Sequence, residues 1–380
     1  MRAEARRYEQ GVEVVVAISE VAERAGVSKM SVSRVLNNSP LVTEATRARV
    51  LQIMAELNYT PNAAARSLRH GRSKLIGVLF PASNNPIYNR YADGIMGTAY
   101  AAGYGVVLCR TDDGRAGAVE ILRLLHEQRV AGVIMHQVEW QAYLPAHLRA
   151  GVRVVSLDQH APGCDRVTLD NMAAMERAVA HLAALGHRHI GMIAGPLRLR
   201  SERERMVGYR RALRRHGLPL ERRWQVLAAD FTDAGGIGAA NALLRCGDRP
   251  SALIVSSSDL TPGVLAAIGA AHLRVPEDLA LVGVGEMSWT ATLVSPITSL
   301  VEPAYQMGAD ACHLLLERRP PRAADQPRRF FYPAHLAVRL SCGAPPAMRD
   351  VPLNSPQSLL FYSAALAWSD SHAGRAAITR

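Results

Sequence analysis

The 380-residue sequence predicts an α/β protein: an N-terminal three-helix unit of the helix-turn-helix type, followed by two similar lobes with parallel sheets. Two observations predict this fold. Apolar residues recur at helical spacing between Ala17 and Leu57, and from Leu75 short apolar runs with strand character alternate with helical stretches. Such alternation is typical of parallel sheets covered on both faces. There are too many units for one domain of this kind, so we expect two lobes with any ligand in the cleft beyond the strand ends.

The N-terminal unit is expected to begin at Ala17, after an extension of residues 1–16 that is charged and has no pattern. Its first helix ends at Gly26, as helices commonly do just before a glycine, and Ser28 is placed to cap the second helix. A third helix follows Thr43. Two helices joined by a short turn with a glycine form the helix-turn-helix pattern.

The second helix, residues 29–37, is predicted to have two different faces. One face carries Lys29, Met30, Ser33, Arg34 and Asn37, and the other carries Val32, Val35 and Leu36. Arginine can donate two hydrogen bonds to guanine, asparagine can pair with adenine, and methionine can contact a thymine methyl group. The first face therefore fits a helix that reads DNA bases, although a solvated basic surface helix is the alternative.

Charge favours nucleic acid as the partner of this unit. The chain has 44 Lys and Arg against 33 Asp and Glu, a formal net charge of +11, and a pI of about 9.8. Residues 17–74 contain nine Lys and Arg and four Glu, so this short segment carries +5 of the total. Such a concentration of positive charge is typical of a surface that binds phosphates.

The second part of the chain is expected to hold seven clear strands. They are predicted at 75–80, 105–109, 132–135, 152–157, 190–194, 252–255 and 279–284. The clearest helices are predicted at 91–102, 118–128, 172–185 and 203–216. After Cys342 this pattern fails, and we assign no role to residues 343–380.

Three segments of the sequence closely resemble the lactose/galactose repressor (LacI/GalR) family: AISEVAERAGVSKMSVSRVLN, AELNYTPNAAARSL and LIGVLF. The resemblance continues through NNPIYNRYADGI, HLAALGHRHIGMIAGP, RVPEDLALVGVGE and SLVEPAYQMG. It implies a two-lobed, periplasmic-binding-protein-like effector domain and a sequence-specific transcriptional regulator, which we expect to be a repressor. It also implies a homodimer that binds a pseudo-palindromic operator in double-stranded DNA. The expected parts are a helix-turn-helix domain at 17–61, a hinge helix and linker at 62–74, and an effector-binding and dimerisation domain at 75–342.

The resemblance also implies which residues contact DNA. Lys29, Met30 and Arg34 match base contacts, while Ser28, Ser31, Ser33 and Asn37 would position the helix on phosphates. The segment NAAARSLR matches the family's hinge helix, which is too short to be stable alone in water. In a dimer two such helices would enter the minor groove, with Leu68 as the wedge, Ala65 at the close approach and Arg69 as a flanking contact. A plain linker is the alternative for this segment.

For the effector, the positions that match the family's ligand contacts are Asp158, Arg205 and Phe231, and Tyr88 in the first strand–helix loop is a further candidate wall. Two positions depart from the family pattern. Ser258 stands where the family usually has Asn, and Gly285 stands where it usually has Asp. Both usual residues bond ligand hydroxyl groups, so we expect a sugar or sugar derivative but leave open an unusual effector or a cleft that binds nothing tightly. Effector binding is expected to move the lobes and so change operator affinity, as an inducer or as a corepressor.

Other classes of protein are disfavoured by the sequence. It contains no nucleophile elbow and no paired-carboxylate signature, so we do not expect an enzyme. The glycines at 283 and 285 do not complete a dinucleotide motif, and His181, His187 and His189 are expected in surface or capping roles, so we expect no cofactor and no metal. The five cysteines form no CxxC pair, and the apolar run near residue 15 is too short to span a bilayer and lacks a cleavage pattern. We therefore expect a cytoplasmic protein without membrane contact; the alternative is a solute-binding protein or α/β enzyme that kept the lobe pair.

Overall fold

The computed structural model describes residues 16–59, 73–83, 85–111, 115–136, 153–158, 163–287, 290, 293–317 and 327–350. The chain divides into two compact units, Met1–Ser73 and Lys74–Arg380. Each unit has a hydrophobic core of its own. In the part of the chain that is described, no helix has the length and apolar character needed to span a bilayer.

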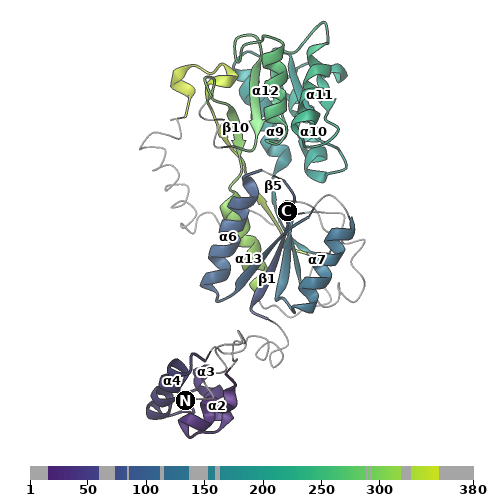
Figure 1. The fold of residues 1–380 in the computed structure, drawn as a ribbon. Helices are drawn as coiled ribbons and strands as arrows, with labels where there is room; N and C mark the ends of the chain where they lie inside the picture. The colour runs from purple at the N-terminus through teal and green to yellow at the C-terminus, as the bar shows by residue number, and fades with distance from the viewer. Residues whose placement is uncertain are drawn as a thin grey trace. The chain divides into compact units, whose positions relative to one another are not determined.

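The N-terminal unit consists of helices α2 (Ile18–Ala25), α3 (Lys29–Leu36) and α4 (Glu44–Glu56) (Figure 1). Its core contains Val21, Val32 and Val50, one from each helix, and all three are fully buried. Gly26 ends α2 in the left-handed conformation, with a φ of 64°, and Ser28 caps α3 by accepting a hydrogen bond from the Ser31 amide at 3.1 Å. The predicted helix ends at Gly26 and Ser28 are thus confirmed.

The first lobe of the second unit contains a sheet in the order β11-β5-β4-β3-β1-β2, with every neighbouring pair parallel. The strands are β1 (Leu75–Pro81), β2 (Gly105–Thr111), β3 (Gly132–Met135), β4 (Val154–Leu157), β5 (Asp165–Leu169) and β11 (Arg329–Tyr332). Helices α6 (Ile87–Ala101) and α13 (Ala304–Leu316) pack side by side on one face, and α7 (Arg115–Glu127) covers the other (Figure 1). Successive residues of β1 serve the two faces: Val78 packs with α6 and α13, and Leu79 packs with α7.

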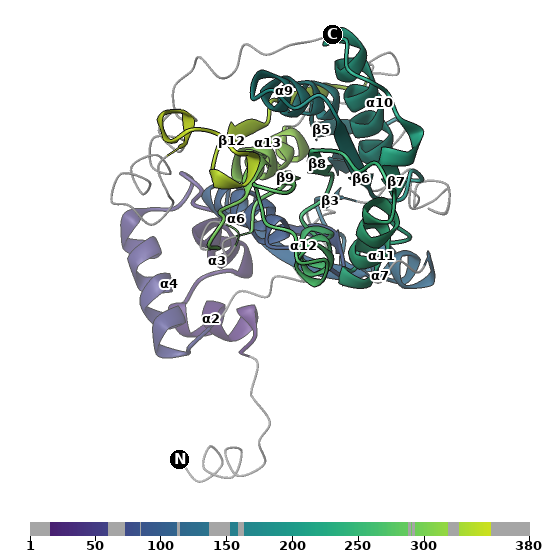
Figure 2. The same ribbon diagram turned by 90° about the horizontal axis from the view of Figure 1, so that it is seen from above.

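The second lobe repeats this plan with a sheet in the order β12-β10-β9-β8-β6-β7. Its strands are β6 (Ile190–Ala194), β7 (Gln225–Leu227), β8 (Ala252–Val255), β9 (Ala280–Val284), β10 (Thr298–Val301) and β12 (His335–Ala337), and only the β10–β12 pair among these is antiparallel. Helices α9 (Asn171–Ala184) and α10 (Arg200–Arg215) cover one face, and α11 (Asp233–Leu244) and α12 (Thr261–Ala270) cover the other (Figure 2).

The chain passes between the lobes three times, after β5, after β10 and after β11. The second passage contains Glu302 and Pro303, and it places α13 in the first lobe although the strand before it belongs to the second. Each sheet therefore gains a strand from the C-terminal part of the chain. Because Glu302 lies in a passage, its side chain can contact residues from both lobes.

The prediction of two α/β lobes with parallel sheets is confirmed. The strands predicted at 132–135, 190–194 and 252–255 match β3, β6 and β8 residue for residue. The predicted helix starts at Tyr91 and Arg203 were wrong, because α6 begins four residues earlier at Ile87 and α10 three residues earlier at Arg200. The amide of Ile87 donates to Asn85 Oδ1 at 3.1 Å, a side-chain contact at the helix start that the apolar pattern does not reveal.

Candidate functional site

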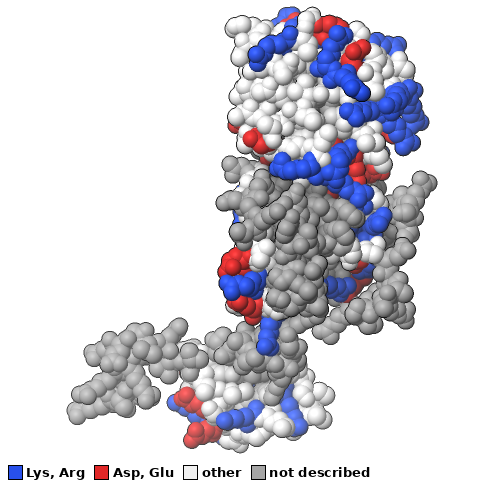
Figure 3. Space-filling model, turned by 90° about the vertical axis from the view of Figure 1, so that its right-hand side faces the viewer, with Lys and Arg blue, Asp and Glu red and all other residues white. Residues whose placement is uncertain are grey.

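Helix α3 exposes the face that was predicted to read DNA. Val32 and Val35 are buried against the other two helices, whereas Lys29 and Arg34 are exposed and Met30 is 63% exposed. Lys and Arg side chains lie on the surface of the N-terminal unit in Figure 3. An exposed methionine beside two cations has no role in the core of this unit. The face therefore offers hydrogen-bond donors and one apolar contact to a partner.

The remaining polar residues of α3 are partly occupied within the helix. The hydroxyls of Ser28 and Ser31 lie 3.0 Å apart, and Asn37 Nδ2 donates to the Ser33 carbonyl at 2.8 Å. These contacts stabilise the two ends of the helix, and Lys29, Met30 and Arg34 are exposed side chains that the predicted base-reading face offers to a partner. The predicted hinge residues Ala65, Leu68 and Arg69 lie outside the described residues.

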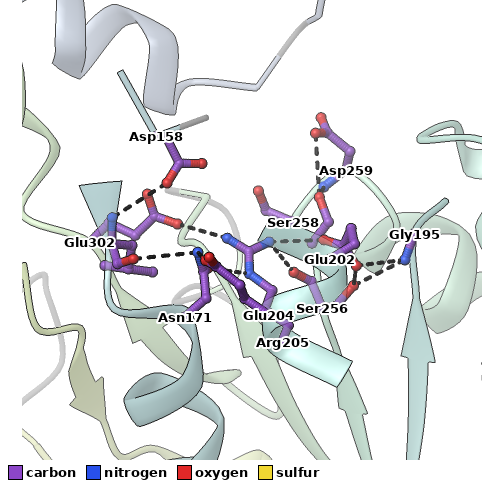
Figure 4. Close-up of polar contacts among 12 residues, drawn as sticks. Asp158, Asn171, Gly195, Glu202, Glu204, Arg205, Ser256, Ser258, Asp259 and Glu302 are labelled. Atoms are coloured by element: carbon purple, nitrogen blue, oxygen red, sulfur yellow. Dashed lines mark hydrogen bonds and ion pairs between the residues drawn. The ribbon is translucent and has the colours of Figure 1, made fainter. Parts of the chain in front are cut away.

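In the second unit, the ends of the strands of both lobes surround the guanidinium group of Arg205. Its Nε donates to Asn171 Oδ1 at 2.8 Å, and its Nη1 donates to Glu202 Oε1 at 3.0 Å and to the Ser256 carbonyl at 2.8 Å (Figure 4). Its Nη2 lies 3.5 Å from Glu302 Oε1, and the side chain is only 8% exposed. Arg205 therefore joins α9, α10, the end of β8 and the passage between the lobes.

Glu202 connects this arginine to the ends of two strands. Its Oε2 accepts hydrogen bonds from the Gly195 amide at 2.8 Å and from Ser256 Oγ at 2.5 Å, just beyond β6 and β8. The Phe231 ring lies against the same turn, because a Cβ on Gly195 would come within 2.3 Å of its Cε1. The predicted wall residue Phe231 is thus half-buried next to the polar cluster.

Asp158 and Glu302 place two buried carboxylates near each other. Asp158 Oδ2 lies 3.6 Å from His136 Nε2, and Glu302 Oε2 accepts a hydrogen bond from the Tyr91 hydroxyl at 2.8 Å. Burial opposes ionisation of Asp158, but the contact with His136 and the charge of Arg205 outweigh it and lower its pKa. Burial and the charge of Asp158 raise the pKa of Glu302 in spite of Arg205. The two groups thus compete for the same positive charge.

The two departures from the family pattern are neighbours in space. Gly285 has a φ of +79°, and a Cβ there would lie 2.8 Å from Ser258 Oγ. Ser258 Oγ accepts a hydrogen bond from Asn85 Nδ2 at 2.8 Å, and the same amide donates to Asp259 at 3.1 Å. Asp259 also accepts from Ser83 Oγ at 3.2 Å. The serine–glycine pair therefore leaves room for a contact between the two lobes through Asn85.

Tyr88 lies in the first turn of α6, so its predicted location in the loop was wrong, because the helix begins at Ile87. Its ring meets the His136 ring edge-on at a centroid distance of 5.0 Å. A cavity of about 170 Å³ adjoins it, lined by Phe80, Ser83, Asn85, Tyr88, Asn89, Leu108 and Arg110. This small cavity lies on the first lobe and adjoins the polar cluster through Asn85.

Of the predicted ligand residues, Asp158 and Arg205 meet in one polar cluster and Phe231 lies at its edge. Ser258 bonds to Asn85 of the first lobe, and Gly285 lies next to Ser258. Glu202, Glu302 and His136 were not predicted from the sequence, although they contact these residues directly. Glu202 could have been found from its spacing, since residues three apart on a helix lie on one face. Glu302 gave a weaker signal, because its position depends on how the chain returns to the first lobe.

The three histidines that were assigned to surface or capping roles each have a separate partner. His181 Nε2 lies 3.2 Å from Cys342 Sγ, His187 Nδ1 lies 3.0 Å from Ser251 Oγ, and the His189 ring packs 5.0 Å from the Trp224 ring. Among the residues that the structure describes, no group of three or more His, Cys, Asp or Glu could hold a metal ion.

Comparison with known protein families gives two matches. Residues 17–62 match the family described as bacterial regulatory proteins, lacI family, and residues 179–342 match the periplasmic binding protein-like domain. The first match contains α2, α3 and α4, and the second contains most of the second lobe together with α13 and β11.

Individual proteins are similar over most of their length. The ribose operon repressor of Escherichia coli is 32% identical over 306 residues, which are 79% of this chain and 92% of that protein. The transcriptional repressor PurR of Photobacterium profundum is 30% identical over 305 residues, covering 79% of this chain and 91% of that protein.

Solved structures agree with these relatives. The lac repressor dimer bound to operator and the anti-inducer ONPF matches with a TM-score of 0.76 and 28% identity, over 86% of this chain and 99% of that one. The complex of the transcriptional regulator CelR with cellobiose matches with a TM-score of 0.64 and 29% identity over the same shares. The expected resemblance is thereby confirmed, and the chain belongs to the lacI family of bacterial regulatory proteins.

Proposed function

We propose that this member of the lacI family represses transcription by binding a pseudo-palindromic operator as a homodimer, and that a small molecule between its lobes sets its operator affinity. The observation that carries the DNA part is the exposed face of α3, where Met30 is 63% exposed between Lys29 and Arg34. The lac repressor relative was solved as a dimer on operator DNA, which supports the same assembly here. A role on DNA places the protein in the cytoplasm, with repression rather than catalysis as its activity.

In this proposal, different residues of the N-terminal unit contact DNA bases and DNA phosphates. Lys29, Met30 and Arg34 read base edges in the major groove, and Ser28, Ser31, Ser33 and Asn37 hold the helix on phosphates. Ala65, Leu68 and Arg69 belong to the hinge that enters the minor groove. The domain boundaries at residues 17, 62, 75 and 342 divide the chain into reading, hinge and effector parts.

The effector part uses the polar cluster at the strand ends. Asp158, Arg205, Ser258 and Gly285 shape the polar surface, and Tyr88 and Phe231 provide apolar walls. The CelR relative was solved with cellobiose, and another relative is a repressor of a ribose operon, so a sugar or sugar derivative is the class to try first. Contacts from both lobes converge on this site, so a ligand there would change how the lobes meet and thereby the hinge.

The test is selection of binding sites from random DNA, followed by gel-shift titration of the full chain at several salt concentrations. The proposal predicts selective binding that weakens steeply with salt, because phosphate contacts release counterions. Arg34→Ala should weaken specific binding by about 10- to 100-fold, as expected for loss of one good base contact. Arg123→Ala, which removes an exposed arginine on α7, serves as the control and should leave it unchanged. Salt-insensitive or non-selective binding would contradict the proposed function.

A further inference from the structure

We propose that the effector carries a protonated amine, and that Glu302 is the residue that selects it over neutral and anionic molecules of the same shape. This inference rests on the proposed function, since it names the ligand class of the same site. It follows from how the guanidinium group of Arg205 is used, from the number of carboxylates around it, and from the aromatic rings beside them.

Three of the five N–H donors of Arg205 already donate to acceptors of the protein, and its Nη2 group faces the Glu302 carboxylate. A guanidinium group has five N–H donors, and acceptors within the protein surround this one on three sides. Asn171 Oδ1, Glu202 Oε1 and the Ser256 carbonyl accept from Nε and Nη1 within 3.0 Å, and Glu302 Oε1 lies 3.5 Å from Nη2. Figure 4 shows the guanidinium group enclosed between these groups. A ligand carboxylate or phosphate would have to displace Glu302 and would then lie beside its charge.

Among the residues that the structure describes, the polar cluster around Arg205 contains more carboxylates than cationic side chains. The cluster contains four carboxylates. Asp158 contacts His136, and Glu202 and Glu302 contact Arg205. The fourth, Asp259, contacts neutral side chains. Asp259 is held by the neutral groups of Ser83 and Asn85. Arg205 is shared between Glu202 and Glu302, so one buried guanidinium serves two carboxylates. Burying carboxylates in such excess is unfavourable unless a cation or a proton joins them.

Arginines further out do not reverse this balance. Arg200 pairs with Glu204 at 2.5 Å, and the Arg166 guanidinium lies over the Phe331 ring, 5.4 Å from its centroid. Arg110 is exposed on the rim of the neighbouring cavity and donates to the Ser83 carbonyl. Among the described residues, counting these three arginines and Glu204 gives five carboxylates against four arginines. Glu202 and Glu302 contact Arg205, and Asp158 contacts His136.

Aromatic rings lie close to the carboxylates of this cluster. The Phe80 and Tyr88 rings pack at 5.3 Å, and the Tyr88 and Tyr91 rings lie 5.0 and 6.1 Å from the His136 ring. Phe80 and Tyr88 also line the cavity of about 170 Å³, which adjoins the cluster through Asn85. Ring faces attract cations within about 6 Å of their centroid, most strongly where water is excluded. The Tyr91 hydroxyl donates to Glu302 and the His136 ring contacts Asp158, so the rings of Tyr88, Tyr91 and His136 lie beside these two carboxylates. Carboxylates next to aromatic rings suit an ammonium group.

The experiment compares molecules of one shape and different charge on the full chain, by thermal shift and isothermal titration calorimetry. The probes are D-glucosamine, D-glucose, N-acetyl-D-glucosamine and D-glucose 6-phosphate, with the galactose and mannose series measured in parallel. We expect at least one amine to bind about tenfold or more tightly than its neutral and phosphorylated counterparts, as for a charge-assisted hydrogen bond. Glu302→Gln should remove most of that preference. Glu176→Gln, whose carboxylate pairs with Arg211 and Arg215 away from the site, should keep it.

The outcomes separate this inference from the proposed function. Neutral or phosphorylated sugars that bind as tightly as every amine, no binding by any amine, or a preference that survives in Glu302→Gln would each overturn it. If Glu302→Gln does not fold, Asp158→Asn and the wild-type comparison of amine with N-acetylated amine give the same decision. Operator binding by the same preparation is measured separately. Selective operator binding without an amine preference overturns only the ligand class, and an amine preference without operator binding overturns only the proposed function.

Discussion

Replacement of Arg205 by methionine tests whether the polar cluster around this residue stabilises the second unit of the chain. Methionine keeps an unbranched side chain of similar length but removes the guanidinium group, so Glu202 and Glu302 lose their shared cation. Their side chains are 1% and 8% exposed, so water cannot replace it. Breaking a buried pair by removing one partner costs about 3–5 kcal/mol. Each carboxylate keeps one or two other hydrogen bonds, which places the expected loss near the lower end of this range.

Differential scanning calorimetry and urea unfolding measure this loss. For a unit of this size about 1 kcal/mol corresponds to roughly 2–4 °C, so Arg205→Met should lower Tm by roughly 6–12 °C. In the double variant with Glu302→Gln part of the loss should be recovered, because one uncompensated charge is gone, with a coupling of about 0.5–3 kcal/mol. Arg211→Met removes a guanidinium that is 66% exposed and pairs with Glu176 at 3.2 Å, so it should cost at most about 1 kcal/mol. Equal losses for Arg205→Met and this control would refute the reasoning.

Three further predictions concern the cap, the glycine and the titration of the cluster. Ser28→Ala should destabilise the N-terminal unit by about 1 kcal/mol, because α3 loses the hydrogen bond from the Ser31 amide, and a Tm equal to wild type would contradict this. Gly285→Ala should destabilise the second unit by about 1–3 kcal/mol, because its φ is +79° and the new Cβ would lie 2.8 Å from Ser258 Oγ. Gly247→Ala, with open space around its Cβ, is the control in the same unfolding assay. The raised pKa of Glu302 means that the folded state binds its proton more tightly than the unfolded state. Its contribution to stability is therefore present below the ordinary glutamate pKa of about 4.3 and is lost as pH rises through the raised value. Glu302→Gln should therefore gain stability relative to wild type between about pH 4 and 7. Asp158→Asn should instead lose stability relative to wild type as pH rises, because the pKa of Asp158 is lowered in the folded state. Urea unfolding at several pH values measures both, and pH profiles parallel to that of wild type would contradict both.

Local features of the sequence were enough to predict the headpiece. Gly26 and Ser28 set the helix ends through backbone conformation and a side-chain cap, and both effects act within a few residues. The two faces of α3 follow from helical periodicity alone, as the burial of Val32 and Val35 shows. Strands such as β6 and β8 were equally clear because they are apolar throughout, as buried parallel strands are.

The interlobe cluster could be predicted only in part, because it depends on contacts between distant segments. Arg205 and Asp158 were found by their match to a family motif, but nothing near Glu302 in the sequence indicates that it lies beside them. Its position follows from the second passage between the lobes, which brings a residue after β10 to the guanidinium group of a residue on α10. Asn85 is a similar case, since its partner Ser258 lies 173 residues away in the sequence.

The neighbouring positions of Ser258 and Gly285 change how the departures from the family pattern are interpreted. In the sequence they are two separate losses of hydroxyl-binding residues. In the structure one leaves the space that the other fills, and Ser258 bonds to the first lobe instead. The charged groups in contact with Arg205 and His136 are carboxylates, which is the basis for expecting an amine.

The most direct test of the account is the operator affinity of the full chain with and without a saturating ligand of the interlobe site. Fluorescence anisotropy on the selected operator gives both affinities, and a scrambled sequence of equal length gives the non-specific reference. The account predicts selective binding that the ligand changes by about 5- to 150-fold in either direction, the range expected for coupling between two sites. It also predicts that operator tightens or weakens ligand binding by the same factor. Selective operator binding that no ligand of the site changes would contradict the claim that the two sites are coupled.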